Sequence, residues 1–314
     1  YSGTPGKRER MRAELLFDDP PEYFDHEKGF IAMHIDVPQQ MLDKCNGEGL
    51  KGPLIADVLD NHFELVHYQL LRLRTALAIS SVTGRAVIMP PIWCEIDKYW
   101  AQLQDGNIPG TSWKKPFICP LDHVLDLEGH WARVLPPDAF GPHIEWRERS
   151  FLQNPRLSAS VNQSRLLVDT CSSHGGDCPG GVTGVQDHKM AVSSAADMHA
   201  LHVAFNTPEA TSHKILELSA GALEALHGAW KTFAQPQLDQ FMNRLKHYPS
   251  NTCCLQEHPP GWVWYDFLAD IPHKDRFNRE FKDKWIYYRG DQGDLATWYN
   301  RPNPGLEVAA AAAA

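Results

Sequence analysis

The sequence has 314 residues, of which 43% are apolar and 22% are charged, and its formal net charge is −9. That length is sufficient for one large α/β domain or two small ones. The acidic balance disfavours a nucleic-acid partner, because phosphate neutralisation needs a basic face. No apolar run approaches the roughly 20 residues that cross a bilayer as a helix.

The first 53 residues contain three recognisable segments. Residues 7–17 (KRERMRAELLF) predict a short helix, which ends at the sequence DDPP. Residues 29–35 (GFIAMHI) have the composition of a strand. Residues 47–53 (GEGLKGP) predict a flexible link.

The strongest local signal is a long helix followed by a strand. Apolar residues recur at helical spacing from Phe63 through Leu70 to Leu77 and beyond. Gly84 is well placed to end this helix in a left-handed conformation. The sequence AVIMP then predicts a short buried strand at 86–90 that Pro90 and Pro91 close. Helix, glycine, strand and proline together form half of a parallel α/β unit.

The region 101–187 is loop-rich, and a second α/β unit follows it. The predicted elements of the C-terminal two thirds are strands at 144–148, 164–169, 214–219 and 262–267 and helices at 220–233 and 236–247. Strands that alternate with helices predict a doubly wound sheet. The fold class is therefore α/β, a Rossmann-like, mostly parallel sheet with flanking helices and a loop-rich middle.

Seven cysteines allow up to three disulfides, and none of them forms a CxxC pair that would indicate a zinc ribbon or a thioredoxin-type site. The stretch CSSHGGDCPGG places Cys171, His174, Asp177 and Cys178 within eight residues, which could hold zinc. Its spacing matches no common zinc site, so a loop closed by a disulfide or left free is favoured. The sequence NQS makes Asn162 a candidate N-glycosylation acceptor.

The opening YSGTPGKRER combines glycines with a basic cluster. Gly3, Gly6 and Lys7 give only GxxGK followed by Arg8, so the hydroxyl that binds magnesium in a phosphate-binding NTPase loop is missing. What remains is an anion-friendly helix start, where backbone N–H groups and Lys7 could contact a diphosphate. The spacing by itself favours a solvated basic first turn instead.

Other polar pairs have both structural and functional interpretations. Arg72 and Arg74 on the long helix could clamp a phosphate, although arginines on a helix more often face water. Asp122 beside His123 could serve a general base, but a polar pair that fixes a loop is the simpler role. The sequence contains no D-x-D metal motif and no nucleophile elbow, so no metal site is predicted within this chain.

Several stretches in order resemble one family. They are GTPGKRERMRAELLFDDPPEYFD, HYQLLRLRTALAISSVTGRAVIMPPIWCEIDKYW, PFICPLDHVLDLE, FGPHIEWRERSFLQNP and GWVWYDF. Together they resemble the C-terminal half of plant and algal glycosyltransferases of family seventy-seven, the nucleotide-diphospho-sugar transferases. That group includes the arabinosyltransferases that act on hydroxyproline-rich glycoproteins. MPPIWC and CPLDHV are the most specific pieces.

The resemblance implies a transfer of arabinose from a nucleotide-sugar donor to a hydroxyproline-rich glycoprotein in the Golgi lumen. It also implies that the metal-binding D-x-D domain, with its Mn or Mg ion, lies before Tyr1. By the same likeness Gly3, Gly6, Lys7 and Arg8 become candidate contacts for the donor diphosphate. Arg74, Asp122 and His123 become candidates for an acceptor or second sugar pocket.

The expected organisation has three parts. Residues 1–52 are expected to form a linker segment whose basic loop closes the upstream domain, and residues 53–308 a Rossmann-like domain. Residues 309–314 are an alanine tail or unassigned residues. Two other functions remain open: a non-catalytic module that binds glycan or builds an assembly, and a fucosyltransferase-like catalytic domain. In the second case, Arg72 or Arg74 would bind the donor.

Overall fold

A computed structural model describes residues 4–45, 56–95, 115–127, 131, 133–174, 178–249, 251–252, 263–265 and 267. The chain divides into two compact units. Unit 1 comprises Tyr1–Asp36, Gln69–Pro91 and Leu127–Tyr248, and unit 2 comprises Val37–Tyr68, Ile92–Asp126 and Pro249–Ala314. In the part of the chain that the structure describes, no helix is both long and apolar enough to span a bilayer.

Unit 1 is built on a six-stranded sheet in the order β5-β2-β1-β8-β6-β7, and every neighbouring pair is parallel. The strands are β1 (Phe30–Met33), β2 (Ala86–Ile88), β5 (Trp146–Arg147), β6 (Arg165–Thr170), β7 (Lys189–Val192) and β8 (Ile215–Leu218). Five of them coincide with predicted strands, whereas no strand was predicted at β7, which follows the loop-rich middle. The predicted α/β, Rossmann-like sheet is thereby confirmed.

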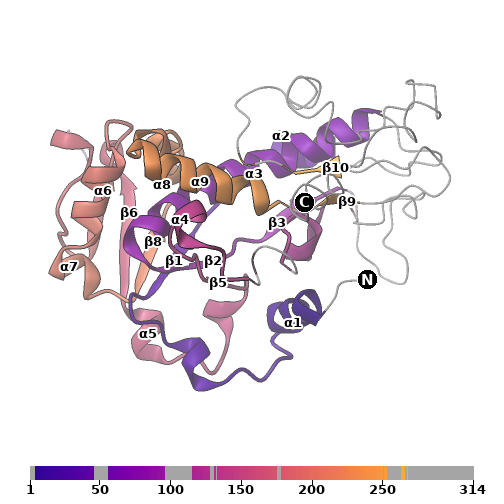
Figure 1. Ribbon diagram of the computed structural model, residues 1–314, viewed down its shortest axis with the longest axis horizontal. Helices are drawn as coiled ribbons and strands as arrows, with labels where there is room; N and C mark the ends of the chain where they lie inside the picture. The colour runs from indigo at the N-terminus through magenta and orange to yellow at the C-terminus, as the bar shows by residue number, and fades with distance from the viewer. Residues whose placement is uncertain are drawn as a thin grey trace. The chain divides into compact units, whose positions relative to one another are not determined.

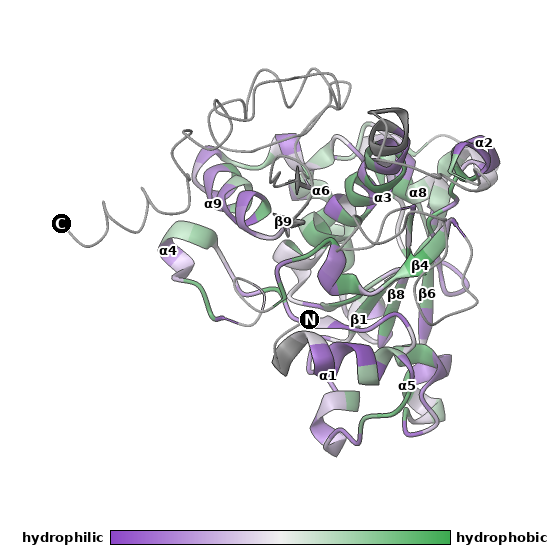
Figure 2. Ribbon diagram, turned by 90° about the vertical axis from the view of Figure 1, so that its right-hand side faces the viewer, coloured by the Kyte–Doolittle hydropathy of each residue, from purple (hydrophilic) through white to green (hydrophobic). Residues whose placement is uncertain are grey.

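Helices cover both faces of this sheet. They are α1 (Thr4–Ala13), α4 (Pro137–Phe140), α5 (Ala159–Gln163), α6 (Met198–Phe205), α7 (Pro208–Thr211), α8 (Ala220–Ala225) and α9 (Gln235–His247), together with the C-terminal part of α3 (Ala56–Thr83). Figures 1 and 2 show α5 on one side of the sheet and α8 and α9 on the other. The core on the α5 side gathers Phe30, Ala32, Ala86, Ile88 and Ile215 from the strands against Phe24, Phe151, Leu157 and Val161.

The long helix follows its prediction closely. Phe63, Leu70 and Leu77 are at most 2% exposed, so the apolar spacing marks the buried face. Gly84 has φ +68 and ends the helix, and its N–H donates to the carbonyl of Ser80 at 2.8 Å. Gly29 (φ +80) closes a turn before β1, where a Cβ would lie 2.3 Å from the Lys214 carbonyl oxygen.

Three boundary predictions need correction. The first helix begins at Thr4 and ends at Ala13, so Gly6 lies inside it rather than in a loop, and Leu15 (φ +57) turns the chain. The helix predicted at 220–233 stops at Ala225, and a separate 3-10 turn follows at Ala229–Thr232 beyond Gly228. A boundary after residue 52 does not separate linker from domain, because β1 pairs with β2 and β8 in the middle of the sheet.

Unit 2 contains α2 (Gln39–Lys44), the first part of α3 and two small antiparallel sheets. One sheet joins β3 (Ile92–Cys94) to β4 (Phe117–Cys119), and a Cys94–Cys119 disulfide links their ends. The other joins β9 (Asn251–Thr252) to β10 (Val263–Trp264), the described part of the predicted late strand. Buried His62 accepts the Glu95 N–H at 3.1 Å through Nδ1, and its Nε2 lies 2.8 Å from the Tyr265 hydroxyl. The alanine tail and Trp262 lie outside the described residues.

Candidate functional site

The carboxyl ends of the strands in unit 1 define the candidate site. Ligands of parallel α/β sheets bind outside the carboxyl ends, where successive connections lead in opposite directions. Here β1 leads to β2 and β5 on one side, while β6 leads to β7 on the other, and β8 lies between β1 and β6. The polar residues at the ends of β1, β8 and β6 are therefore the first to consider.

The half of this edge formed by β1, β8 and β6, here called the open half, carries half-exposed charged groups. Glu217, the last residue but one of β8, accepts hydrogen bonds from two neighbours. Its Oε1 lies 2.7 Å from Nε2 of His34, which follows β1, and its Oε2 lies 3.2 Å from Nη1 of Arg165, which reaches it from the amino end of β6. The side chain of His34 is 63% exposed, against 16% for Glu217. Solvent therefore reaches the imidazole, whereas the carboxylate is held in place.

The charge of Glu217 is stabilised in the folded chain. Burial by itself raises the pKa of this carboxyl group, but the hydrogen bonds from His34 and Arg165 outweigh it, so the pKa lies below its ordinary value. Glu217 is thus an anion at neutral pH. Together with the accessible imidazole it provides acceptors for the hydroxyl groups of a bound ligand.

A hydroxyl group and a backbone N–H bond to a second carboxylate on the open half. Oδ1 of Asp169 accepts the Ser219 hydroxyl at 2.7 Å and the Thr170 N–H at 2.8 Å. Ser219 in turn caps α8 by accepting the Ala222 N–H at 3.1 Å. A Cβ at Gly221 would lie 2.9 Å from the Thr170 side chain, so the glycine lets the start of α8 lie close to the end of β6.

The other half of the edge, at the ends of β2 and β5, is closed. Glu148 follows β5, is 1% exposed and accepts a hydrogen bond from the Tyr23 hydroxyl. The Tyr23 ring lies between two guanidinium groups, with Arg12 at 4.3 Å and Arg147 at 4.4 Å from its centroid. Nε of Arg147 donates to the Tyr23 carbonyl at 2.9 Å, and Arg12 is paired with Asp19 at 2.8 Å.

In the closed half the pKa values of the titratable groups are raised, opposite to the shift of Glu217. Burial raises the pKa of Glu148, and the hydrogen bond from Tyr23 offsets only part of the shift. Burial and the neighbouring Glu148 raise the pKa of Tyr23. These groups are sealed by the chain segment that contains Arg12 and Tyr23, so the open half is the part of the edge available to a ligand.

The predicted site residues are distributed over both compact units. Lys7 and Arg8 are exposed on α1, and the Arg8 guanidinium lies 5.7 Å from the Phe17 ring centroid; Gly3 lies outside the described residues. Arg74 is fully buried in unit 1 with its guanidinium 4.7 Å from the Trp230 ring centroid, and Arg72 pairs with Glu224. The arginines invoked for a fucosyltransferase-like donor site are thus engaged in internal contacts.

Asp122 and His123 occupy a buried 3-10 turn of unit 2, so they belong to a different compact unit from Arg74. Asn162 lies on α5, where its Nδ2 donates to the Leu152 carbonyl at 3.1 Å and its Oδ1 accepts from Arg165 at 2.5 Å. Its glycosylation stays a prediction. Cys171 and Cys178 form a disulfide, which confirms the closed-loop interpretation and commits both sulfur atoms.

Sequence reasoning missed His34, Glu217, Asp169 and Ser219, although the signal was present. His34 follows the strand FIAM, and Asp169 and Ser219 come at the ends of the predicted strands at 164–169 and 214–219. Polar residues that end parallel strands meet at one edge of the sheet. Applying that rule to each predicted strand would have identified the open half.

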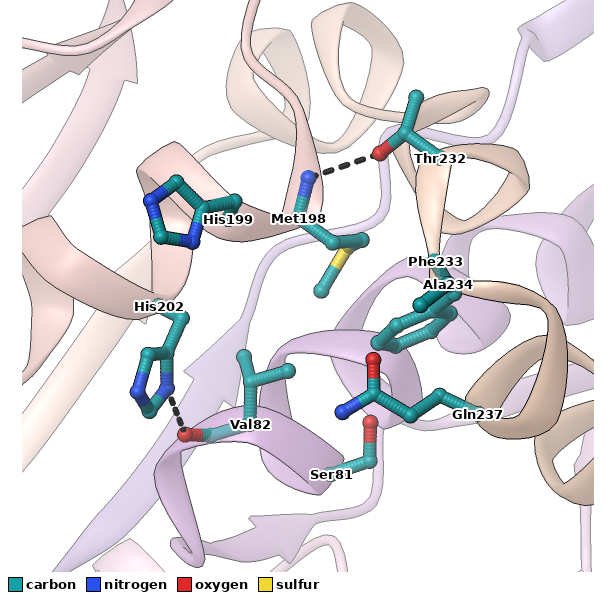
Figure 3. A pocket seen from close by; sticks show the side chains of 9 residues that line it. All are labelled: Ser81, Val82, Met198, His199, His202, Thr232, Phe233, Ala234 and Gln237. Carbon is teal, nitrogen blue, oxygen red and sulfur yellow. Dashed lines mark hydrogen bonds between the residues drawn. The ribbon is translucent and has the colours of Figure 1, made fainter.

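Unit 1 also contains a hollow of about 460 Å³ away from this edge, lined by Ser81, Val82, Met198, His199, His202, Thr232, Phe233, Ala234 and Gln237. Figure 3 shows Met198 and Val82 in the middle of the hollow, Ser81 and Gln237 on one side of them, and His202 of α6 on the other side, where it bonds to the Val82 carbonyl. None of the sequence predictions concerned this hollow.

Comparison with known proteins supports the motif resemblance. The chain is 33% identical over 271 residues to Arabinosyltransferase XEG113 of Arabidopsis thaliana, and the aligned region is 86% of this chain. It covers 39% of that protein, so the chain spans well under two thirds of its relative. No family model matches the chain, and no solved structure matches it. The similarity confirms the family that the motifs indicate: over this stretch the chain is a relative of the plant arabinosyltransferases of glycosyltransferase family seventy-seven.

Proposed function

We propose that this chain is part of a secretory-pathway arabinosyltransferase that moves arabinose from a nucleotide-sugar donor to a hydroxyproline-rich glycoprotein in the Golgi. The observation that carries the proposal is the 33% identity with a plant arabinosyltransferase over 86% of the chain. The Rossmann-like sheet supports it, because such sheets bind nucleotides and sugars at their carboxyl edge.

The open half supplies the chemistry of a sugar site. The carboxylates of Glu217 and Asp169 accept hydrogen bonds from sugar hydroxyls, and His34 can accept or donate one. Arg165 fixes Glu217 in place, and Ser219 does the same for Asp169. These residues would bind and orient a sugar at the ends of β1, β8 and β6.

The divalent metal belongs outside this chain in this proposal. Within the described residues, no group of three or more His, Cys, Asp or Glu side chains is arranged to hold a metal ion. The proposed transferase is expected to use a Mn or Mg ion. We assign that ion, with the nucleotide, to the upstream domain, and we retain Gly3, Gly6, Lys7 and Arg8 as proposed contacts of the donor diphosphate.

The test is a transfer assay on the whole polypeptide that contains this chain. The protein is incubated with a nucleotide-diphosphate arabinose and a hydroxyproline-rich peptide, and the product is analysed by mass spectrometry for an added pentose. The proposal predicts pentose addition that falls strongly in the double variant Lys7→Ala/Arg8→Ala, through a raised donor KM. A folded whole polypeptide that transfers no pentose would refute the proposed function.

The activities of the variants distinguish the arabinosyltransferase proposal from the proposed diphosphate contacts. Lys7 and Arg8 are exposed, so their removal leaves the fold intact. Full activity of the double variant would leave the arabinosyltransferase proposal standing and remove only the diphosphate contacts. His34→Ala offers the complementary test, because loss of an exposed imidazole from the open half is expected to weaken sugar binding without unfolding the protein.

A further inference from the structure

We propose that the hollow between α3, α6 and α9 is a binding site for a neutral oligosaccharide, separate from the open half of the sheet edge. The proposal does not depend on transferase activity. It rests on the shape of the hollow, the absence of charge in its lining and the kind of hydrogen-bonding capacity that its residues leave unused.

The hollow is large and continues into a neighbour. It measures about 460 Å³. A second hollow of about 190 Å³ shares Ser81, Val82, Phe233 and Gln237 with it and extends along α9 towards Gln240. The two hollows adjoin at these shared residues, and together they offer room for a chain of linked sugar rings.

No charge is available to a ligand in the main hollow. None of its nine lining residues is Lys, Arg, Asp or Glu. Arg244, which lines the second hollow, is 2% exposed and already donates to the carbonyls of Phe140 and Gly141 at 2.9 Å each and to the Tyr248 hydroxyl at 2.6 Å. An anionic ligand would find no free cation among these residues.

The ends of three helices line the hollow. The carbonyl of Val82, near the C-terminal end of α3, forms part of the wall and accepts hydrogen bonds from Nδ1 of His202 at 2.9 Å and from Asn206 at 3.2 Å. Met198 begins α6 and Ala234 directly precedes α9, so two helix N-termini lie in the wall as well. A helix C-terminus carries a partial negative charge and a helix N-terminus a partial positive one, so the helix ends by themselves do not select an anion.

The lining offers more acceptors than donors. Ser81 donates its proton to the Ala78 carbonyl at 2.7 Å, so its oxygen is left as an acceptor. Thr232 donates its proton to the Ala229 carbonyl at 2.6 Å and already accepts the Met198 N–H at 2.8 Å, so its oxygen can accept at most one further hydrogen bond. His202 donates through Nδ1 to the Val82 carbonyl, which leaves Nε2 as an acceptor. A ligand that fits must therefore carry many hydrogen-bond donors.

Gln237 supplies the matching donor. It is exposed on α9, and Figure 3 shows its amide directed towards Ser81 across the hollow. A polyol has several hydroxyl groups, each of which donates one hydrogen bond and accepts others, so it satisfies this lining. A phosphate only accepts, and an extended peptide offers one donor per residue. The apolar side chains of Val82 and Met198 suit the C–H face of a sugar ring.

The test measures binding of neutral tetrasaccharides of arabinose, xylose and glucose to the whole protein by calorimetry and by NMR. Gln237→Ala removes the free amide, and Ala234→Trp fills the hollow from its exposed rim. Gln163→Ala is the matched control, because Gln163 is an exposed helical glutamine that lines neither hollow. Thermal unfolding confirms that each variant is folded.

The proposal predicts that at least one tetrasaccharide binds and that a roughly tenfold rise in salt leaves the affinity unchanged, since no charge is involved. Gln237→Ala is expected to weaken binding by about tenfold, the value of one or two hydrogen bonds. Ala234→Trp is expected to abolish binding, and Gln163→Ala to have no effect.

The proposal is overturned if no tetrasaccharide binds the folded protein, or if binding persists unchanged in both Gln237→Ala and Ala234→Trp. It is also overturned if an unglycosylated hydroxyproline peptide binds instead and Ala234→Trp abolishes that binding. Binding without pentose transfer would leave the groove in place and count against the arabinosyltransferase proposal. Transfer without tetrasaccharide binding would refute the groove alone.

Discussion

A glutamate has a lowered pKa in one half of the sheet edge and a raised pKa in the other. Glu217 in the open half keeps solvent contact, pairs with His34 and Arg165 and has a lowered pKa. Glu148 in the closed half is sealed under Tyr23 and has a raised pKa. The difference does not arise from the strands. It arises from the segment carrying Arg12 and Tyr23, which covers β2 and β5 and leaves β8 and β6 uncovered by those residues.

Arg147→Ala should produce the largest effect, because it opens the closed half. Its guanidinium is 6% exposed, donates to the carbonyls of Tyr23 and Trp146 at 2.9 Å each and packs on the Tyr23 ring. Loss of these contacts leaves buried carbonyls unsatisfied and should cost about 3 kcal/mol of the free energy of unfolding in urea. Arg165→Ala in the open half is the control, with an expected cost of about 1 kcal/mol. Equal losses of unfolding free energy in the two variants would refute the distinction between the closed and the open half.

Glu217→Gln should destabilise the protein by about 1 kcal/mol at neutral pH, since charged hydrogen bonds to half-exposed partners are lost. The folded pKa is lowered, so the stabilisation is present above the ordinary glutamate pKa and disappears as pH falls through the folded value. The difference in unfolding free energy between wild type and variant should therefore shrink on acidification. A difference that grows in acid would contradict the assignment.

Glu148→Gln should show the opposite pH slope. Because the folded pKa is raised, the folded chain binds more protons than the unfolded chain, and wild-type stability falls as pH rises from the ordinary glutamate range through the folded pKa. The amide keeps an acceptor for the Tyr23 hydroxyl, so the variant should lie within about 1 kcal/mol of wild type at neutral pH. Chemical denaturation at several pH values measures both slopes, and parallel slopes for the two variants would be evidence against the comparison.

Ser219→Ala should have the smallest effect on the free energy of unfolding. It removes the N-cap of α8, directly after β8. Ser219 caps α8 and also donates to Asp169, whereas Ser158 caps α5 by accepting the Val161 N–H at 3.3 Å and has no carboxylate partner. Each alanine variant should lose about 1 kcal/mol from the cap. The Ser219 variant should lose more than its control, because Asp169 loses a hydrogen bond. A loss of unfolding free energy no larger than that of Ser158→Ala would show that the hydrogen bond to Asp169 adds no stability.

The strands of this fold could be predicted, and their arrangement could not. FIAM, AVI, RLLVDT and ILEL are short apolar or alternating runs beside turn residues, which is a local property of the sequence. The pairing of β1 with β8 joins residues about 185 positions apart. Nothing in either segment specifies the other, so the sequence placed β1 in a linker instead of the centre of the sheet.

The site was predictable to the same extent. Lys7 and Arg8 on α1 are exposed, whereas Arg12 is partly buried against Asp19 and Tyr23, partners that the basic cluster alone does not reveal. Gly6 is helical, because the helix extends one turn further towards the N-terminus than its charges suggest. Arg74 is paired with an aromatic ring that comes 156 residues later in the chain, a contact that helical periodicity cannot reveal. Residues at strand ends are predictable, whereas contacts between distant segments depend on the completed fold.

The surroundings of Tyr23 have a spectroscopic consequence. Two guanidinium groups pack on its ring, and its hydroxyl donates a hydrogen bond to the buried carboxylate of Glu148. Its pKa lies above that of an ordinary tyrosine, so in an alkaline titration of ultraviolet absorbance Tyr23 should stay protonated while exposed phenols among the nine tyrosines ionise. The same enclosure should protect it from nitration. Tyr23 is therefore a built-in optical probe, and its late ionisation would mark the moment at which the segment over β5 separates from the sheet.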